Sequence, residues 1–260
     1  MTPSVAHCTL RCRFCWRVQS EDIHLPFNET AMDAWDDPSS IVEGAIEAQK
    51  RILSGYKAHA LVSSERYSEA IEPKHAAISL AGEPALYPDL NGLVREFHSR
   101  DFTTFIVTNG TVPERIEKLE REPTQFYVSV CASSEASFLK VCKPQIAGAW
   151  QKLNKTLDLL SSLSCPTVMR LTLARDVNLS DAEGYAKLIE KANPTYVEPK
   201  AYVYVGMSRL RLRFENMPTH KEIREFGERL CTLTGYQMID ESKSSRVVLL
   251  SRLKKAIRLI

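Results

Sequence analysis

What the sequence lacks already excludes several classes of protein. None of its apolar runs approaches the ~20 consecutive residues that a membrane-spanning helix needs. Its first residues show no apolar core of the kind found in secretory signal peptides. It also has no internal repeat, low-complexity tract or linker that would separate two domains. We therefore expect a single cytoplasmic domain spanning residues 1–260, with no membrane contact.

Excess positive charge is small overall and concentrated near the C-terminus. The 34 Lys and Arg residues exceed the 32 Asp and Glu residues by only two. Residues 1–206 carry 22 basic and 26 acidic residues, whereas residues 207–260 carry 12 and 6. A solvated surface rich in Lys and Arg explains this composition, and a polyanionic partner such as nucleic acid is the alternative. We expect a core of about residues 1–206 and a basic extension of about residues 207–260.

Three of the seven cysteines form one tight group. Cys8, Cys12 and Cys15 have the spacing C-x3-C-x2-C, and Phe14 directly precedes the last of them. Such a group favours a reducing compartment and metal binding over disulfides. Iron–sulfur clusters are normally held by four cysteines, so a [4Fe–4S] cluster held by three keeps one iron open for chemistry. We predict that Cys8, Cys12 and Cys15 bind such a cluster.

Structural zinc, with His7 or His24 as a fourth ligand, would also use such a group, and chance clustering could produce it. Zinc sites usually contain two paired-ligand groups, and this chain shows one. The regular spacing makes chance the weaker alternative. The remaining cysteines are scattered, and we expect them to be small buried hydrophobic residues. They are Cys131, Cys142, Cys165 and Cys231.

The cysteine spacing with its aromatic residue resembles the signature of radical S-adenosylmethionine (SAM) enzymes. In that superfamily, the open iron binds the amino and carboxylate groups of SAM. One electron from the cluster then cleaves SAM to a 5′-deoxyadenosyl radical. The resemblance implies that the cofactors are one [4Fe–4S] cluster and SAM.

Strand-like apolar runs alternate with amphipathic helical patterns along the chain. We expect strands at residues 75–81, 102–108, 125–131, 167–173 and 195–205, after a brief strand within 1–6. Helices are expected at residues 40–54, 88–100, 147–163, 181–192 and 220–233 and after Pro113, and two short strands at 236–251. This alternation predicts βαβ units and a parallel sheet. About six units are too few for a closed barrel. We predict an α/β fold, an open (β/α)6 partial TIM barrel of the radical SAM type with a short C-terminal β extension.

Polar and glycine residues follow the expected strands, where the active site of a parallel βα fold gathers. Gly82 and Glu83 end one strand, Asn109 ends the next, and Ser129 lies near the end of a third. Glycine lets the backbone approach a ligand closely, although a plain turn would also use it. We call residues 8–15 the cysteine loop. Beside this loop, Gly82-Glu83-Pro84 resembles the superfamily element that contacts the SAM amino group.

Arg170 lies on an expected strand among apolar neighbours, so it needs a carboxylate partner. The SAM carboxylate is one candidate, and Glu83 or Glu198 is the structural alternative. Glu198 and Lys200 alternate onto one side of the last parallel strand. Lys200 is the lysine expected inside the barrel mouth, where a lowered pKa would permit a Schiff base. An ion pair with Glu198 would work against that.

Longer strings of residues resemble one family, the tRNA 4-demethylwyosine synthases, especially the archaeal form. The resemblance covers almost the whole chain. The strings are Met1–Ala6, the cysteine group with Trp16 and Arg17, Glu72–His75, Ser79–Pro84, Val107–Gly110, Arg170–Leu173, Lys200–Tyr202, Met217–His220, Asp240–Ser242 and Arg246–Arg252.

The resemblance implies radical SAM chemistry on N1-methylguanosine next to the anticodon of tRNA-Phe, with pyruvate donating two carbons to the third ring of wyosine. The implied partners are the tRNA-Phe anticodon arm, pyruvate and a flavodoxin- or ferredoxin-type electron donor. The protein itself is expected to be a monomer. The implied catalytic residues are Lys200 and Arg170. The implied cofactor-binding residues are Phe14, Gly82, Glu83, Asn109, Ser129 and Arg170.

Three departures from the family pattern affect the expected activity. The resemblance starts at an internal Met-Thr-Pro of the family, whose upstream segment supplies a second cluster's cysteines and a lysine proposed to handle pyruvate. Cys131 stands where the family usually has aspartate, and Pro199 interrupts a strand. We expect these 260 residues to cleave SAM without forming the tricyclic base. A radical SAM enzyme of other substrate and an idle tRNA-binding remnant are the alternatives.

The basic extension contains an alternating Arg-Leu-Arg-Leu-Arg run. If the run is extended, Arg209, Arg211 and Arg213 lie on one side. We predict that they contact the tRNA backbone, together with the basic residues after Lys243, although an exposed edge strand would show the same alternation.

Overall fold

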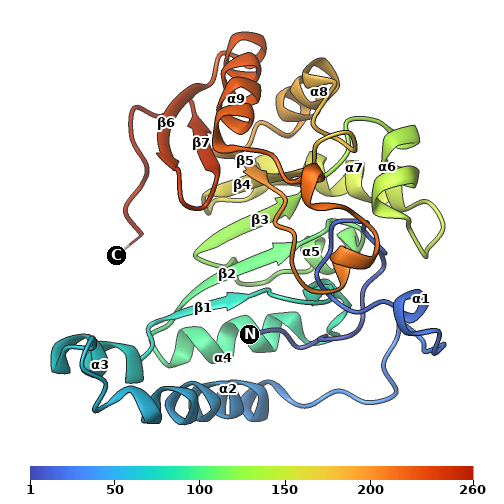
Figure 1. Ribbon diagram of the computed structural model, residues 1–260. Coiled ribbons are helices and arrows are strands. Elements are labelled where there is room, and N and C mark those ends of the chain that lie inside the picture. Colours follow the sequence, from blue (N-terminus) through green and yellow to red (C-terminus); the bar gives the residue numbers. More distant parts are fainter. Residues whose placement is uncertain (260) are drawn as a thin grey trace.

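A seven-stranded sheet organises the computed structural model, which describes residues 1–259 (Figure 1). The strand order is β1-β2-β3-β4-β5-β7-β6. The first five strands are parallel, and they are β1 His75–Ile78, β2 Thr103–Thr108, β3 Gln125–Ser129, β4 Thr167–Leu173 and β5 Tyr196–Ala201. Two antiparallel strands complete the sheet, and they are β7 Val247–Ser251 beside β5 and β6 Gln237–Ser242 at the edge. A mixed α/β fold with a parallel sheet and a C-terminal β extension is therefore confirmed.

Helices follow the strands and cover one face of the sheet (Figure 1). The α-helices are α1 Ser20–Ile23, α2 Pro38–Leu53, α3 Ser64–Ile71, α4 Leu90–Ser99, α5 Pro113–Glu117, α6 Glu135–Cys142, α7 Ala149–Leu159, α8 Ala182–Ala192 and α9 His220–Thr234. Short 3₁₀ turns are η1 Ser54–Tyr56, η2 Pro84–Leu86, η3 Leu160–Ser162, η4 Gly206–Leu210 and η5 Phe214–Asn216. Among residues 1–259, no helix has the length and apolarity that crossing a bilayer requires.

The two faces of the sheet differ in polarity, and this difference places the site. Residues that alternate toward the helices are fully buried and apolar, as Ile106, Val128 and Met169 are. The opposite face carries polar residues on its last strands, where Arg170 is in register with Glu198. Polar groups are therefore gathered on the face that the helices leave open.

The expected N-terminal strand does not form, so the parallel part contains five strands rather than six. Met1 touches β1 through two hydrogen bonds, from its amino group to Ala77 O and from Ser79 N to its own carbonyl, both 2.8 Å. Pro3 has no N–H to extend this pairing, and the chain then turns, with His7 N donating to Ser4 O.

The other differences from the predicted elements are local. Helices α3 and α6 were not predicted, and strand 195–205 ends at Ala201. Pro199 does not interrupt β5, because the chain stays extended and its pairing with β7 resumes at Lys200. A proline fits there since it only removes one donor from the ladder.

Candidate active site at the ends of the strands

A pocket of about 170 Å³ opens at the carboxyl ends of β1 to β4. The three cysteines of the N-terminal group all line it. Its other lining residues are Leu10, Phe14, Ser79, Leu80, Gly82, Glu83, Val107, Thr108, Asn109, Ser129, Cys131, Phe138, Cys142 and Thr172. Eight of the ten residues predicted for the site therefore meet in one place: the three cysteines, Phe14, Gly82, Glu83, Asn109 and Ser129.

The cysteine loop is held beside the sheet by the end of helix α6. Arg11 N donates to Cys142 O at 3.0 Å, and Arg13 N donates to Val141 O at the same distance. Gln145 N donates to Thr9 O at 2.9 Å. The last carbonyls of a helix have no partner within the helix, so these contacts satisfy α6 and fix the loop together.

The surroundings of Cys8 and Cys12 disfavour free thiolates. Burial, and the nearby Glu83 carboxylate, raise the pKa of the Cys8 thiol. A hydrogen bond with Cys142, and burial, raise the pKa of the Cys12 thiol. Positively charged irons would stabilise the thiolates that this environment otherwise disfavours.

The spacing of the side chains bears on the kind of metal group that they could hold. Among residues 1–259, no three His, Cys, Asp or Glu side chains come close enough to hold one metal ion. Thiolates that each bind a different iron of a cluster lie farther apart than ligands that share one zinc at about 2.3 Å. Three thiols in one pocket have the chemistry to hold a [4Fe–4S] cluster, and their assignment as its ligands stays a prediction.

Gly82 and Glu83 connect the end of β1 to the cysteine loop. Gly82 has φ +73°, and a Cβ there would lie 1.8 Å from Ser4 O and 2.6 Å from His7 O. Only glycine fits this conformation and this close approach. Glu83 N donates to His7 O at 2.8 Å. The segment that leads into Cys8 therefore packs directly on the Gly82 backbone.

The Glu83 carboxylate is buried and accepts three hydrogen bonds. Thr108 Oγ1 donates at 2.6 Å, Ala85 N at 2.9 Å and Asn109 N at 2.7 Å. Burial raises the pKa of Glu83, although these donors oppose the rise. Its side chain links the segment after β1 to the end of β2, and Glu83 also lines the pocket.

Asn109 and Ser129 occupy the ends of β2 and β3. The Asn109 amide donates to Thr9 Oγ1 at 2.9 Å and to the Cys8 sulfur at 3.5 Å. Ser129 lines the pocket, and its hydroxyl takes part in none of the hydrogen bonds of the described residues. Asn109 therefore orients the cysteine loop, and Ser129 offers a free donor to a ligand.

Arg170 and Lys200 lie on the same face of the sheet but do not line the pocket. The Arg170 guanidinium binds the Glu198 carboxylate at 2.8 and 3.2 Å and lies over the Tyr127 ring. Glu198 is therefore the carboxylate partner of Arg170 in this structure, and the geometry gives no support to a SAM contact. The expected pair of Glu198 with Lys200 is not among the ion pairs of residues 1–259.

Two further cysteines line the pocket, a position that the sequence does not predict. Cys131 and Cys142 are buried, as predicted, but both line the pocket. Cys131 follows β3 closely, and its place near a strand end was a usable signal. Cys142 ends α6, which was not predicted, so nothing in the sequence placed it beside Cys12.

The prediction that three arginines share one side is wrong. The chain forms the 3₁₀ turns η4 and η5 there instead of an extended strand. Arg211 points inward, where it pairs with Asp22 and donates to the Arg13 and Cys15 carbonyls. Arg209 and Arg213 remain exposed.

The matches to known families agree with this geometry. Residues 2–189 match the radical SAM superfamily, and residues 191–252 match a family described as wyosine base formation. The fold and the cysteine-lined pocket thus define a radical SAM protein, whose superfamily implies a [4Fe–4S] cluster and SAM. Within that superfamily, the chain belongs to the S-adenosyl-L-methionine-dependent tRNA 4-demethylwyosine synthases.

Its relatives match nearly all of the chain. The synthase of Pyrococcus abyssi is 50% identical and covers 97% of this chain, which spans 74% of that protein. The synthase of Methanocaldococcus jannaschii is 40% identical, with coverage of 98% and 81%. A solved structure described as TYW1 with a lysine-pyruvate adduct bound has a TM-score of 0.86 at 37% identity, and covers 99% of this chain and 80% of that one.

Proposed function

We propose that this chain carries the radical SAM chemistry that converts N1-methylguanosine in the anticodon loop of tRNA-Phe to 4-demethylwyosine, with pyruvate as carbon donor. The observation that supports it is the meeting of three cysteine thiols with strand-end polar groups in one pocket. The family's names and the lysine-pyruvate adduct of the solved relative support the substrates. The protein would act in the cytoplasm as a monomer, with an electron from a flavodoxin- or ferredoxin-type donor.

Each part of the pocket has a role in this proposal. Cys8, Cys12 and Cys15 would hold one [4Fe–4S] cluster, which supplies the electron that cleaves SAM to a 5′-deoxyadenosyl radical. Ser129 would donate to SAM, because its hydroxyl is exposed to the pocket. Phe14 would cover the bound cofactor and keep water from the radical.

The functional test is SAM cleavage by the reduced 260-residue polypeptide with pyruvate and tRNA containing N1-methylguanosine. We expect 5′-deoxyadenosine to form. The pyruvate lysine and the second cluster of the family belong to a segment outside these residues, so we expect no 4-demethylwyosine. The Pyrococcus abyssi enzyme, of which this chain spans 74%, is the positive control for product. Mass spectrometry of the nucleosides measures it.

The outcomes separate the parts of the proposal. If the reduced protein binds SAM but forms no 5′-deoxyadenosine, an idle remnant is the better description. If 4-demethylwyosine does form, residues within this chain handle pyruvate. Lys200 is the first candidate, because no ion pair of residues 1–259 engages it and it lies opposite the pocket residue Thr172.

An exposed aromatic and basic surface beside the pocket supports the tRNA substrate. We call residues 203–214 the rim segment. The Tyr204 and Phe214 rings meet edge to face at 6.0 Å, and Arg209 lies over the Tyr204 ring. Met207 N donates to Trp16 O, so the rim segment lies beside the chain that follows Cys15. Exposed rings and arginines are how proteins bind the unstacked bases of RNA loops.

Replacing Arg209 and Arg213 together by alanine is expected to weaken tRNA-Phe binding and to reduce its salt dependence. Each lost phosphate contact lowers the slope of log affinity against log salt by about 0.7–0.9. The matched control is the double variant Lys187→Ala/Arg229→Ala on α8 and α9, which removes the same charge elsewhere. Filter binding at several salt concentrations measures both. Equal slopes for the two double variants would mean that the rim segment arginines are only solvated.

A further inference from the structure

The carbonyl side of the cysteine loop is held by side chains rather than by regular backbone pairing. Buried carbonyls need donors, and an irregular loop around a ligand has no repeating ladder to supply them. Gln145 and Gln19 serve Cys8 O and Cys12 O at 3.1 and 3.0 Å. Among the described residues, the other side-chain donors to carbonyls of this segment are two guanidinium groups, Arg17 from within it and Arg211 from nearly 200 residues away.

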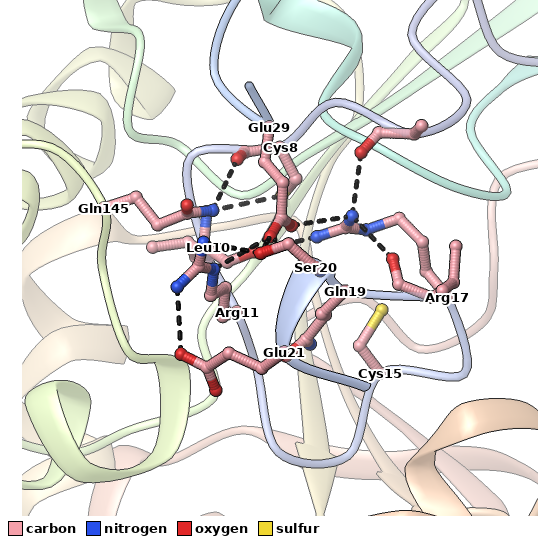
Figure 2. Close-up of polar contacts among 12 residues, drawn as sticks. Cys8, Leu10, Arg11, Cys15, Arg17, Gln19, Ser20, Glu21, Glu29 and Gln145 are labelled. Atoms are coloured by element: carbon pink, nitrogen blue, oxygen red, sulfur yellow. Dashed lines mark hydrogen bonds and ion pairs between the residues drawn. The ribbon is translucent and has the colours of Figure 1, made fainter. Parts of the chain in front are cut away.

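Arg17 donates to backbone carbonyls on both sides of Cys8. Its Nη1 donates to Ala6 O at 2.8 Å and to Val18 O at 2.9 Å, and its Nη2 donates to Leu10 O at 3.3 Å. Figure 2 shows the guanidinium between these segments. Because Ala6 and Leu10 lie on either side of Cys8, the position of the Cys8 thiol depends on Arg17.

A buried carboxylate keeps Arg17 in place. Glu29 has a fully buried side chain and lies 3.0 Å from Arg17 Nη1. Its other oxygen accepts from Arg11 Nε at 2.8 Å and from the Ser20 hydroxyl at 2.8 Å (Figure 2). The Arg11–Glu29 contact is a charge-assisted hydrogen bond, whereas Glu29 Oε2 faces Arg17 as an ion pair without a hydrogen bond. Glu29 O also accepts from Cys8 N at 2.6 Å, so the pair is joined to the loop twice.

Arg211, which belongs to the rim segment, donates to backbone carbonyls on both sides of Phe14. Its Nε donates to Arg13 O at 3.3 Å and its Nη2 to Cys15 O, while Nη1 pairs with the buried Asp22. Arg13 and Cys15 flank Phe14 at the pocket, so Arg211 fixes the third thiol much as Arg17 fixes the first. Only a guanidinium presents several donors in one rigid plane.

We propose that Arg17 and Arg211 are positioning residues for the iron–sulfur cluster. They hold the carbonyl side of the loop so that the Cys8 and Cys15 thiols stay in the pocket before the cluster binds. Arg211 also connects the loop to the rim segment, so the same side chain contacts both the proposed cluster loop and the proposed tRNA-binding segment. This inference rests on the proposed cluster site.

The test compares variants that keep the charge balance and remove the planar donors. Arg17→Lys keeps the charge beside Glu29, and Arg211→Met/Asp22→Asn removes a cation together with its anion. Arg229→Met/Glu183→Gln removes an exposed ion pair between α9 and α8 and controls for the loss of one cation and one anion. The readouts are the melting temperature and hydrogen exchange of the cluster-free protein, the rate of iron release to a chelator, and the electron paramagnetic resonance spectrum of the reduced cluster.

We expect both loop variants to fold, with amides of residues 8–17 exchanging faster than in the parent. Losing charge-assisted hydrogen bonds predicts iron release about tenfold faster or more, and a changed spectrum. The control should match the parent in every readout, and Arg211→Lys with Asp22 retained should restore part of the difference.

Three outcomes would overturn the inference. One is parent-like exchange and iron release in both loop variants. Another is an equal change in the control. The third is global unfolding of Arg17→Lys together with parent-like behaviour of the Arg211 variant. If the parent protein itself binds no iron, the proposed function fails, while the exchange data still decide whether these arginines order the loop.

Discussion

Replacing Cys8, Cys12 and Cys15 together by alanine is expected to abolish cluster binding. The parent protein, reconstituted anaerobically with iron and sulfide, should load about four irons per chain, because one cubane cluster contains four. The triple variant should load almost none and release no 5′-deoxyadenosine from SAM. Iron analysis, visible absorption and SAM cleavage measure the change. The expected effect is large because the chain offers no other group of this spacing.

A double Cys165→Ala/Cys231→Ala variant is the control, since neither cysteine lines the pocket. It should load iron as the parent does. Single replacements are less informative, because Cys131 and Cys142 lie in the same pocket and offer substitute thiols. Retention of about four irons by the triple variant would show that the cluster is held by other residues, and the assignment would be abandoned.

Gly82→Ala is expected to have the largest effect of any single change outside the cysteines. A methyl group there would meet the Ser4 and His7 carbonyls at 1.8 and 2.6 Å, and both belong to the backbone. The segment that leads into Cys8 would have to move away from β1. We expect the free energy of unfolding to fall by about 3 kcal/mol or more, and cluster loading to fall with it. Chemical denaturation and iron analysis measure the two effects.

Gly235→Ala separates backbone strain from steric clash. Gly235 ends helix α9 with φ +71°, close to the +73° of Gly82, but a Cβ there meets nothing within 4 Å. It should therefore show only the conformational cost of alanine in this region, about 1 kcal/mol. Similar losses for both variants would mean that the contact of Gly82 with Ser4 and His7 is relaxed in solution.

The regular elements were predictable because their local patterns agree with their packing. Strand β4 has the predicted bounds, and helix α9 begins at His220 as expected. The sequence does not predict helix α6, because it has only eight residues and helices of that length depend on packing rather than on propensity. The run Arg209–Arg213 was misjudged for a related reason: the inward contacts of Arg211 outweigh the local alternation.

The site was predictable where chemistry leaves a local signature. The cysteine spacing and the strand-end residues Gly82, Asn109 and Ser129 all lie in the pocket. The hydrogen bonds that hold the cysteine loop in place are not predictable from the sequence. Arg17 follows the motif, but only the fold reveals that its donors reach Ala6 and Leu10. For Arg170 the sequence leaves the SAM carboxylate, Glu83 and Glu198 as candidate partners, and the register of β4 with β5 brings Glu198 beside it.

The support of the cysteine loop also sets an order for maturation. The motif leaves the ribosome well before Arg211, because the hydrogen bond between Arg211 and Arg13 spans 198 residues of chain. At ordinary rates of translation that interval lasts roughly 10–40 s. Throughout it the three thiols belong to an unfinished loop, exposed to oxidants and to stray metal ions. Iron and sulfide would thus be delivered after Arg211 has been synthesised, and cells would need to shield the three thiols until then.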